Sequence, residues 1–215
     1  MWEDILLLLF PERCIGCNRA GSAICALCER TVSTKPRALS QHTAALFDYQ
    51  HPLVKKALWA LKYRRKRALG KYFGIALYRE FFKPLARGGK GTANDIVLVP
   101  IPASAKAVAM RGYNHSGVIA TTIVEAGKAD GLTLSLERNM LFKKRENPRQ
   151  VEAMTKHERE KNVEHIFGVK NGKSVTGKIV VLIDDVTTTG ATIRDARRAL
   201  LAWKPKRVLA VVVAH

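Results

Sequence analysis

Four cysteines near the start of the chain have the spacing of a metal site. They are Cys14, Cys17, Cys25 and Cys28, and the chain contains no other cysteine. Two intervening residues let both thiolates of a pair point at one metal ion, and two such pairs complete a tetrahedral tetrathiolate site, which suits structural zinc. Two disulfides or a redox Cys-x-x-Cys pair are the alternatives. We recognise no signal peptide, so we expect a reducing compartment, the cytoplasm, where disulfides are disfavoured.

A second group of chemically active residues follows the apolar run at residues 179–183. Asp184 and Asp185 come first, then a threonine-rich loop with one glycine, then the apolar stripe of a helix. The loop offers backbone N–H groups, hydroxyls and the positive end of a helix dipole, so it can cradle an anion of phosphate size. The carboxylates can accept hydrogen bonds from vicinal sugar hydroxyls or hold a hydrated Mg²⁺. Walker A and dinucleotide fingerprints are missing, and the plain alternative is a turn with a threonine-rich N-cap.

Positive charge is concentrated in one part of the chain. The sequence has 37 Lys and Arg against 18 Asp and Glu, a formal net charge of +19. Residues 50–90 hold twelve of the basic residues and one acid, Glu80. The densest run contains Lys62, Arg64, Arg65, Lys66 and Arg67. With Trp59 and Tyr63 nearby, this pattern is typical of single-stranded nucleic-acid binding, and a solvated basic face is the alternative.

Alternating strand and helix patterns predict the fold that positions these residues. Apolar runs typical of buried strands cover residues 96–99, 179–183 and 208–213. Shorter strands are expected at residues 45–49 and 132–136, and helical spacing of apolar residues indicates helices around residues 53–61, 118–126 and 193–203. Continuous apolar strands separated by helices indicate an α/β domain with a mostly parallel sheet covered on both faces.

Length and composition predict two domains. A chain of 215 residues with 47% hydrophobic residues allows one ordinary domain plus a small appendage and excludes a wholly disordered chain. We expect a zinc-binding module over residues 1–35 and the α/β domain over residues 43–215, with a polar linker at residues 31–42 that contains Pro36. The apolar stretch at residues 5–10 is too short to span a bilayer, so we expect no membrane span.

The strand, acid pair and threonine-rich loop at residues 180–192 resemble the phosphoribosyl pyrophosphate (PRPP) loop of type I phosphoribosyltransferases. Further motifs narrow the resemblance: Val99-Pro100-Ile101-Pro102, Arg111-Gly112-Tyr113-Asn114, Arg145…Gln150…Arg159-x-x-Asn162…Phe167, and the doubled Cys-x-x-Cys. Together, and over nearly the whole chain, they resemble the ComF family of competence-associated proteins, in which a zinc module is joined to a type I phosphoribosyltransferase domain. His115, Asn147 and Thr187 depart from the usual Gln, Thr and apolar residue of that family.

The resemblance implies roles for individual residues. Asp184 and Asp185 would bind the ribose 2′- and 3′-hydroxyls of PRPP, with Mg²⁺ assisting. The residues expected around the 5′-phosphate are Thr188, Thr189, Gly190, Ala191 and Thr192, and Thr187 is also expected to belong to the PRPP-binding loop. The residues expected in the pyrophosphate loop are Ala103, Ser104 and Lys106. Arg145 would lie in the loop that closes over PRPP in related transferases, where it could stabilise the charge of the leaving pyrophosphate.

Two functions follow from the resemblance and the charge. The first is a competence-associated protein that binds PRPP and single-stranded DNA during natural transformation, with the basic run on DNA and the zinc module on a protein partner of the DNA-uptake machinery. The alternative is an active phosphoribosyltransferase that acts on an unidentified small-molecule acceptor and has no nucleic-acid role. No evident general base for an acceptor is present, so the sequence leaves turnover by the transferase open.

Overall fold

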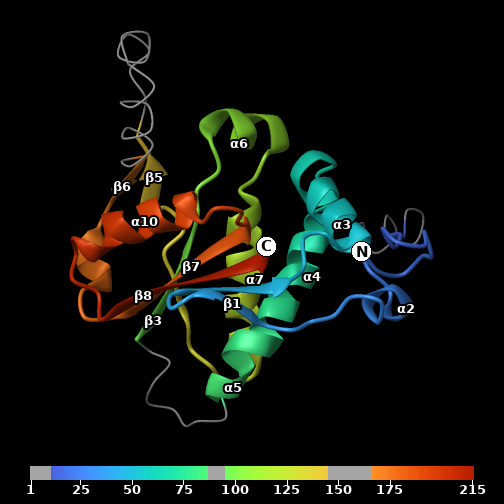
Figure 1. Cartoon of the computed structure of the whole chain (residues 1–215), viewed down its shortest axis with the longest axis horizontal. Coiled ribbons are helices and arrows are strands. Elements are labelled where there is room, and N and C mark those ends of the chain that lie inside the picture. Colours follow the sequence, from blue (N-terminus) through green and yellow to red (C-terminus); the bar gives the residue numbers. More distant parts are fainter. Residues whose placement is uncertain (1–10, 87–94, 145–165) are drawn as a thin grey trace, which may run out of the picture.

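A six-stranded sheet forms the centre of the computed structural model, which describes residues 11–86, 95–144 and 166–215 (Figure 1). The strand order is β1-β2-β8-β7-β3-β4. In chain order the strands are β1 (Arg37–Ser40), β2 (Thr43–Phe47), β3 (Ile96–Pro100), β4 (Ser135–Leu136), β7 (Ile179–Val186) and β8 (Arg207–Ala214). β1 is antiparallel to β2, and every other neighbouring pair is parallel. The segments that follow β3 and β7 therefore leave the sheet at the same edge.

The central strand β7 is buried on both faces, and its first five residues are all branched aliphatic, which is typical of a buried parallel strand. Val181 and Ile183 belong to the core on one face of the sheet, whereas Val180 and Leu182 belong to the core on the other face. This alternation follows from the two-residue period of a strand. β7 pairs with β3 on one side and with β8 on the other, which holds its carboxyl end in the middle of the sheet edge.

Helices cover both faces of the sheet (Figure 1). One face carries α3 (Pro52–Tyr63), α4 (Arg67–Leu77) and α7 (His115–Ala129). The other face carries α10 (Ala191–Leu201) together with the hairpin of β5 (Leu141–Lys143) and β6 (Phe167–Val169). The short helical elements are α2 (Ala26–Glu29), η1 (Tyr78–Phe82), α5 (Lys83–Ala86), α6 (Ala105–Arg111) and η3 (Gly172–Val175). Within the ranges given above, no helix is both long and apolar enough to cross a membrane.

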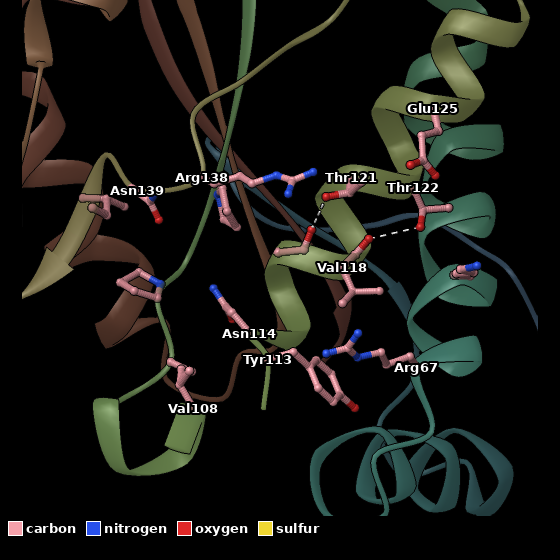
Figure 2. Close-up of a pocket in the computed structure, with 16 residues that line it drawn as sticks. Arg67, Val108, Tyr113, Asn114, Val118, Thr121, Thr122, Glu125, Arg138 and Asn139 are labelled. Carbon is pink, nitrogen blue, oxygen red and sulfur yellow. Dashed lines mark hydrogen bonds between the residues drawn. The ribbon is translucent and has the colours of Figure 1, made fainter. Parts of the chain in front are cut away.

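Two glycines let α4 and α7 approach each other closely. A Cβ atom on Gly70 would lie 2.9 Å from Cγ1 of Val118, and one on Gly74 would lie 2.6 Å from Cβ of Thr122. Figure 2 shows Val118 and Thr122 on the side of α7 that faces α4. The close contact brings the first turn of α7 against the helical layer that contains α3 and α4.

The predicted mostly parallel sheet and its helices are confirmed, and two local expectations are corrected. The linker expected at residues 31–42 contains the edge strand β1, whose four side chains are largely exposed. The strand expected at residues 132–136 is reduced to the two residues of β4, because Gly131 has a positive φ of 74° and the chain enters the sheet only after a turn. Helix α4 lies inside the basic region and was not predicted.

We expect Gly74→Ala to lower the free energy of unfolding by about 1–3 kcal/mol, because the added methyl group must displace Thr122 and the backbone oxygen of Ile119, which lies 2.9 Å from the ideal Cβ position. Gly117→Ala in α7 is the matched control, since the nearest atom to its Cβ would be 3.6 Å away. Urea unfolding followed by circular dichroism measures both changes. Equal midpoints for Gly74→Ala and the parent protein would contradict the close contact.

Candidate functional site

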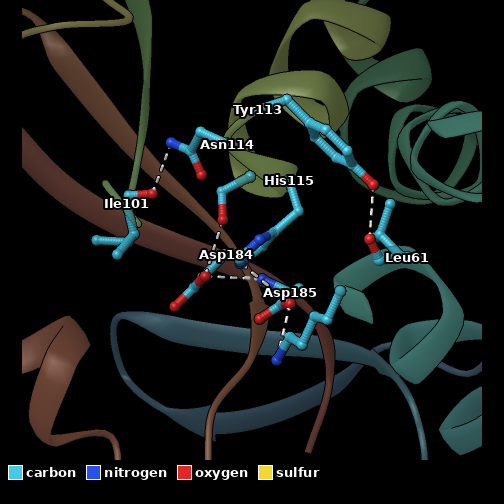
Figure 3. Close-up of polar contacts among 9 residues, drawn as sticks. Leu61, Ile101, Tyr113, Asn114, His115, Asp184 and Asp185 are labelled. Atoms are coloured by element: carbon cyan, nitrogen blue, oxygen red, sulfur yellow. Dashed lines mark hydrogen bonds and ion pairs between the residues drawn. The ribbon is translucent and has the colours of Figure 1, made fainter. Parts of the chain in front are cut away.

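The two adjacent carboxylates of β7 are buried where the strand reaches the edge of the sheet (Figure 3). Asp184 is 7% exposed and Asp185 is 3% exposed. Oδ1 of Asp184 accepts hydrogen bonds from Oγ of Ser116 and from the backbone N–H of Asp185, each at 2.9 Å. Burial, followed by the neighbouring charge of Asp185, raises the pKa of Asp184 to about 7, although the two hydrogen bonds act in the opposite direction.

Asp185 is compensated by two side chains from the helical layer. Nζ of Lys62 lies 2.8 Å from its Oδ2 atom, and Nε2 of His115 lies 3.2 Å from the same atom. Burial lowers the pKa of His115, and the carboxylate of Asp185 opposes that effect. Sequence reasoning missed Ser116 and the pairing of Lys62 with Asp185. The only sequence signal for Ser116 and His115 was their position directly after the Arg111-Gly112-Tyr113-Asn114 motif.

That motif builds the framework on which the first turn of α7 rests (Figure 3). Asn114 occupies the N-cap position, and its Nδ2 atom donates to the backbone oxygen of Ile101 at 3.0 Å. The hydroxyl of Tyr113 donates to the backbone oxygen of Leu61 at 2.6 Å. These bonds tie α7 to the segment after β3 and to α3, and so fix the positions of His115 and Ser116.

A cavity of about 310 Å³ opens at the acid pair and collects residues from several elements. Of the residues predicted to bind PRPP, it brings together Ala103, Ser104, Asp184, Asp185 and Thr192. Three cationic side chains also line it, namely Lys62, Arg111 and Lys143. A cavity with two carboxylates at its base and cations at its walls can hold a ligand that carries both hydroxyl groups and negative charge.

Other predicted residues have different surroundings. The loop residues 187–190 line a second cavity of about 280 Å³, together with Arg37 of β1 and Arg194 of α10. Gly190, with a φ of 74°, is the N-cap of α10, while Thr188 and Thr189 are exposed beside that helix end. Lys106 is exposed on α6 and lines neither cavity.

Two predicted residues contribute to the backbone framework. The backbone N–H of Thr187 donates to the backbone oxygen of Ala214, which extends the pairing of β7 with β8. Oγ of Ser104 accepts from the backbone N–H of Ala107 and so caps α6. Several predicted residues lie outside the described residues, namely Arg145 with the rest of residues 145–150, Arg159 and Asn162.

The four cysteines converge, as their spacing predicted. Their sulfur atoms all lie within 4.8 Å of one another, and those of Cys17 and Cys25 are 3.6 Å apart. Four ligands at the usual Zn–S distance of about 2.3 Å would be roughly 3.8 Å apart in a tetrahedron, so the cluster fits a zinc ion. Burial raises the pKa of Cys14, but the stronger combined effect of backbone N–H groups, including those of Cys17 and Cys25, lowers it to about 6.

The cysteine module packs on the α/β domain, and the basic run contacts other segments of that domain. Ile15, Ala23 and Ile24 of the module share one core with Leu53 of α3. In the basic run, Arg65 donates to the backbone oxygen of Met110 at 2.8 Å. Arg67 lies over the ring of Tyr113, 4.7 Å from its centroid. The run is therefore partly engaged with α6 and with the segment between α6 and α7.

The comparisons with known proteins agree with this architecture. A model of the phosphoribosyl transferase domain matches residues 90–215, which is more than half of the chain. The chain therefore belongs to the phosphoribosyl transferase domain family. With the sheet topology, this membership confirms a type I phosphoribosyltransferase-like fold, to which the N-terminal cysteine cluster is added.

One similar protein is the competence protein ComFC of Bacillus subtilis (strain 168). It is 29% identical over 219 residues, which cover 93% of this chain and 82% of that protein. The resemblance predicted from the sequence motifs is confirmed by this match. Among solved structures, a hypoxanthine phosphoribosyltransferase from Staphylococcus aureus has 17% identity and a TM-score of 0.41, with 66% of this chain and 62% of that chain covered. The corresponding enzyme from Trypanosoma cruzi has 12% identity and a TM-score of 0.41, with 70% and 67% covered.

We expect the protein purified without chelators to contain about one zinc ion per chain, and Cys14→Ser to lose most of it, because a tetrathiolate site needs all four sulfur ligands. Elemental analysis by plasma emission measures the metal content. Arg19→Ser, an exposed change in the same module, is the control and should keep the zinc. Full zinc content in Cys14→Ser would show that this cysteine is not a ligand.

Proposed function

We propose that the protein binds PRPP at the cavity around Asp184 and Asp185. The observation that carries the proposal is the buried acid pair at the carboxyl end of β7, in a cavity that is also lined by Ser104, Thr192 and three cationic side chains. Ribose hydroxyls are donors, and two oriented carboxylates offer them acceptors that are already freed from most of their water. PRPP also carries several negative charges, which the cationic walls of the cavity would balance.

Each part of the site would have a separate task. Ser116 and the backbone N–H of Asp185 hold Asp184 in one orientation, so a hydroxyl donor would meet a fixed acceptor. The 5′-phosphate would bind the exposed threonine hydroxyls and backbone N–H groups of residues 188–192, where the start of α10 favours negative charge. When bound, Mg²⁺ would supply further positive charge for the pyrophosphate oxygens. His115, Asp184 and Asp185 have ligand atoms within 4.8 Å of one another and could hold such an ion.

The cations of the cavity wall would favour departure of pyrophosphate. Lys62, Arg111 and Lys143 come from α3, α6 and β5 and line the same space as the acid pair. Fixed positive charge near the leaving group stabilises the charge that develops there. We extend this role to Arg145, which follows β5 closely in the chain. We assign no acceptor for the phosphoribosyl group. The alternative function is an active transferase that acts on a small-molecule acceptor, and an assay for released pyrophosphate would detect that activity.

Replacing both Asp184 and Asp185 by Asn should weaken PRPP binding in the presence of Mg²⁺ by roughly 100-fold, since two hydrogen bonds to charged acceptors contribute about 3 kcal/mol together. Isothermal titration calorimetry of the zinc-containing protein measures the change. Asp95→Asn is the control, because this exposed residue precedes β3 at the opposite end of the strand. Unchanged affinity in the double variant would refute the site.

We further propose that the protein is competence-associated and binds single-stranded DNA along α3 and the start of α4. An aromatic and cationic ladder supports this surface. Trp59 and Tyr63 are 50% and 55% exposed, with ring centroids 5.7 Å apart. Arg64 lies over the ring of Trp59, and Arg111 lies over that of Tyr63, each at 5.0 Å. Exposed aromatic rings beside arginines can stack on bases while the cations contact phosphates. The name of the Bacillus subtilis relative places that protein in competence.

The basic run would divide its work between the two ligands. Lys62 is bound to Asp185 and would serve the PRPP cavity first, whereas Arg64 and Arg65 are exposed and would serve DNA, with Lys66 and Arg67 beside them. The zinc module, which packs on α3, would be placed next to the bound strand and could contact a protein partner of the DNA-uptake machinery.

Arg64→Glu/Arg65→Glu should weaken binding of a single-stranded oligonucleotide at 50 mM salt and reduce the magnitude of the slope of log affinity against log salt by about 1.4, because about 0.7 counterion is released per phosphate contact. Fluorescence anisotropy across a salt series measures both quantities. The charge-matched control Lys173→Glu/Lys206→Glu changes two exposed lysines outside α3 and α4 and should leave the slope nearly unchanged. An identical loss in both double variants would mean that net charge alone governs binding.

A further inference from the structure

A larger cavity lies on the other side of the segment that follows β3. It has a volume of about 550 Å³ and is bounded by α4, α6, α7, the segment before β5 and the start of β5 (Figure 2). Its lining has only Pro102 and Ala103 in common with the cavity at the acid pair. The two spaces are thus neighbours across one stretch of backbone, and neither Asp184 nor Asp185 lines the larger one.

The walls of this cavity carry an excess of positive charge. Arg67 and Lys71 come from α4 and Arg138 from the segment between β4 and β5, while Glu125 is the one acidic residue of the lining. No ion pair joins any of these three cations to another residue that the structure describes. Figure 2 shows the guanidinium group of Arg138 extending toward Thr121, with Arg67 on the opposite wall beside Tyr113. The cations therefore flank the space from two elements.

Arg67 is held in position before any ligand binds. Its guanidinium group lies 4.7 Å from the centroid of the Tyr113 ring, and its Nη2 atom donates to the backbone oxygen of Gly112 at 3.4 Å. The ring is itself fixed through the hydrogen bond from the Tyr113 hydroxyl to Leu61. A preorganised guanidinium group loses little conformational entropy when it binds an anion.

The rest of the lining is largely apolar. Pro100, Val118 and Leu141 offer hydrocarbon surface, and Val108 adds to it from α6. The hydroxyl groups of Thr121 and Thr122 already donate to backbone oxygens one turn earlier in α7, so they are not free donors. A small inorganic anion would leave this hydrocarbon surface in water, whereas a ligand with a flat apolar part and a charged part would cover it.

We infer that this cavity binds a nucleoside phosphate, with the base against the apolar wall and the phosphate between Arg67, Lys71 and Arg138. The volume lies within the range of pockets that hold small organic ligands. The ligand is either a free nucleotide or one nucleotide of a single strand, since both present the same base and phosphate. The inference does not depend on PRPP binding, because the cavity shares only Pro102 and Ala103 with the cavity at the acid pair and its cations are different residues.

The test is calorimetric titration of the zinc-containing full chain with AMP, UMP, adenosine and inorganic phosphate. We expect the nucleotides to bind more tightly than adenosine or phosphate, and Lys71→Gln/Arg138→Gln to weaken them at least 10-fold. Both residues are exposed, so the fold should be preserved. The control Lys128→Gln/Lys206→Gln removes the same charge at exposed positions outside the cavity and should leave the affinities unchanged.

A second background separates this cavity from the acid pair. We expect the Asp184→Asn/Asp185→Asn variant to keep its nucleotide binding. The opposite result would overturn the inference: if the Asp184→Asn/Asp185→Asn variant lost nucleotide binding and the Lys71→Gln/Arg138→Gln variant kept it, the nucleotide would bind at the acid pair. Absence of nucleotide binding at millimolar concentration, or equal affinity for inorganic phosphate, would also overturn it. A further experiment asks whether AMP displaces a bound thymidine tetranucleotide. Displacement, together with loss of AMP and tetranucleotide binding in Lys71→Gln/Arg138→Gln, would support the cavity as the binding site and identify single-stranded DNA as a source of its ligand.

Discussion

The burial of two neighbouring carboxylates is the constraint on which much of this structure depends. A carboxylate removed from water needs hydrogen bonds or a counter-charge, and Asp184 and Asp185 are buried side by side at the carboxyl end of the central strand β7. The partners come from outside the sheet: Ser116 and His115 from the first turn of α7, and Lys62 from the last turn of α3. The acid pair thus links the helical layer to β7. A displacement of α3 or α7 away from β7 would leave a buried carboxylate without its partner.

The close contact of α4 with α7 places those partners where they are needed. Gly70 and Gly74 allow the two helices to approach, and Tyr113 connects the start of α7 to the backbone of α3. The basic run between α3 and α4 is consequently not a uniform charged surface. Lys62 turns inward to the acid pair, Arg67 turns to the ring of Tyr113, and Arg64 stays with the exposed Trp59. One run of similar residues therefore faces three different environments.

Local patterns were sufficient for the main elements of the fold. Apolar β-branched runs predicted β3, β7 and β8, since buried parallel strands need no polar face, and the spacing of apolar residues predicted α7 and α10. The edge strand β1 was missed because its exposed residues look like a linker. Helix α4 was missed because glycine and basic residues interrupt its apolar pattern, and the glycines have a reason only in the presence of α7.

The sequence by itself determined the residue types of two candidate sites: four cysteines in two close pairs, and two acids before a threonine-rich loop. The residues of each group lie within a few positions of one another in the chain, so their types and spacing alone indicate their chemistry. The convergence of the four sulfur atoms agrees with the metal site that the cysteine spacing predicted. Only the tertiary structure decided that Lys62, His115 and Ser116 compensate the acids, that the threonine loop faces a separate cavity with β1, and that Arg67, Lys71 and Arg138 surround a larger one. These residues are distant in sequence, so their meeting depends on the order of the strands and the close packing of α4 on α7, which local sequence patterns do not encode.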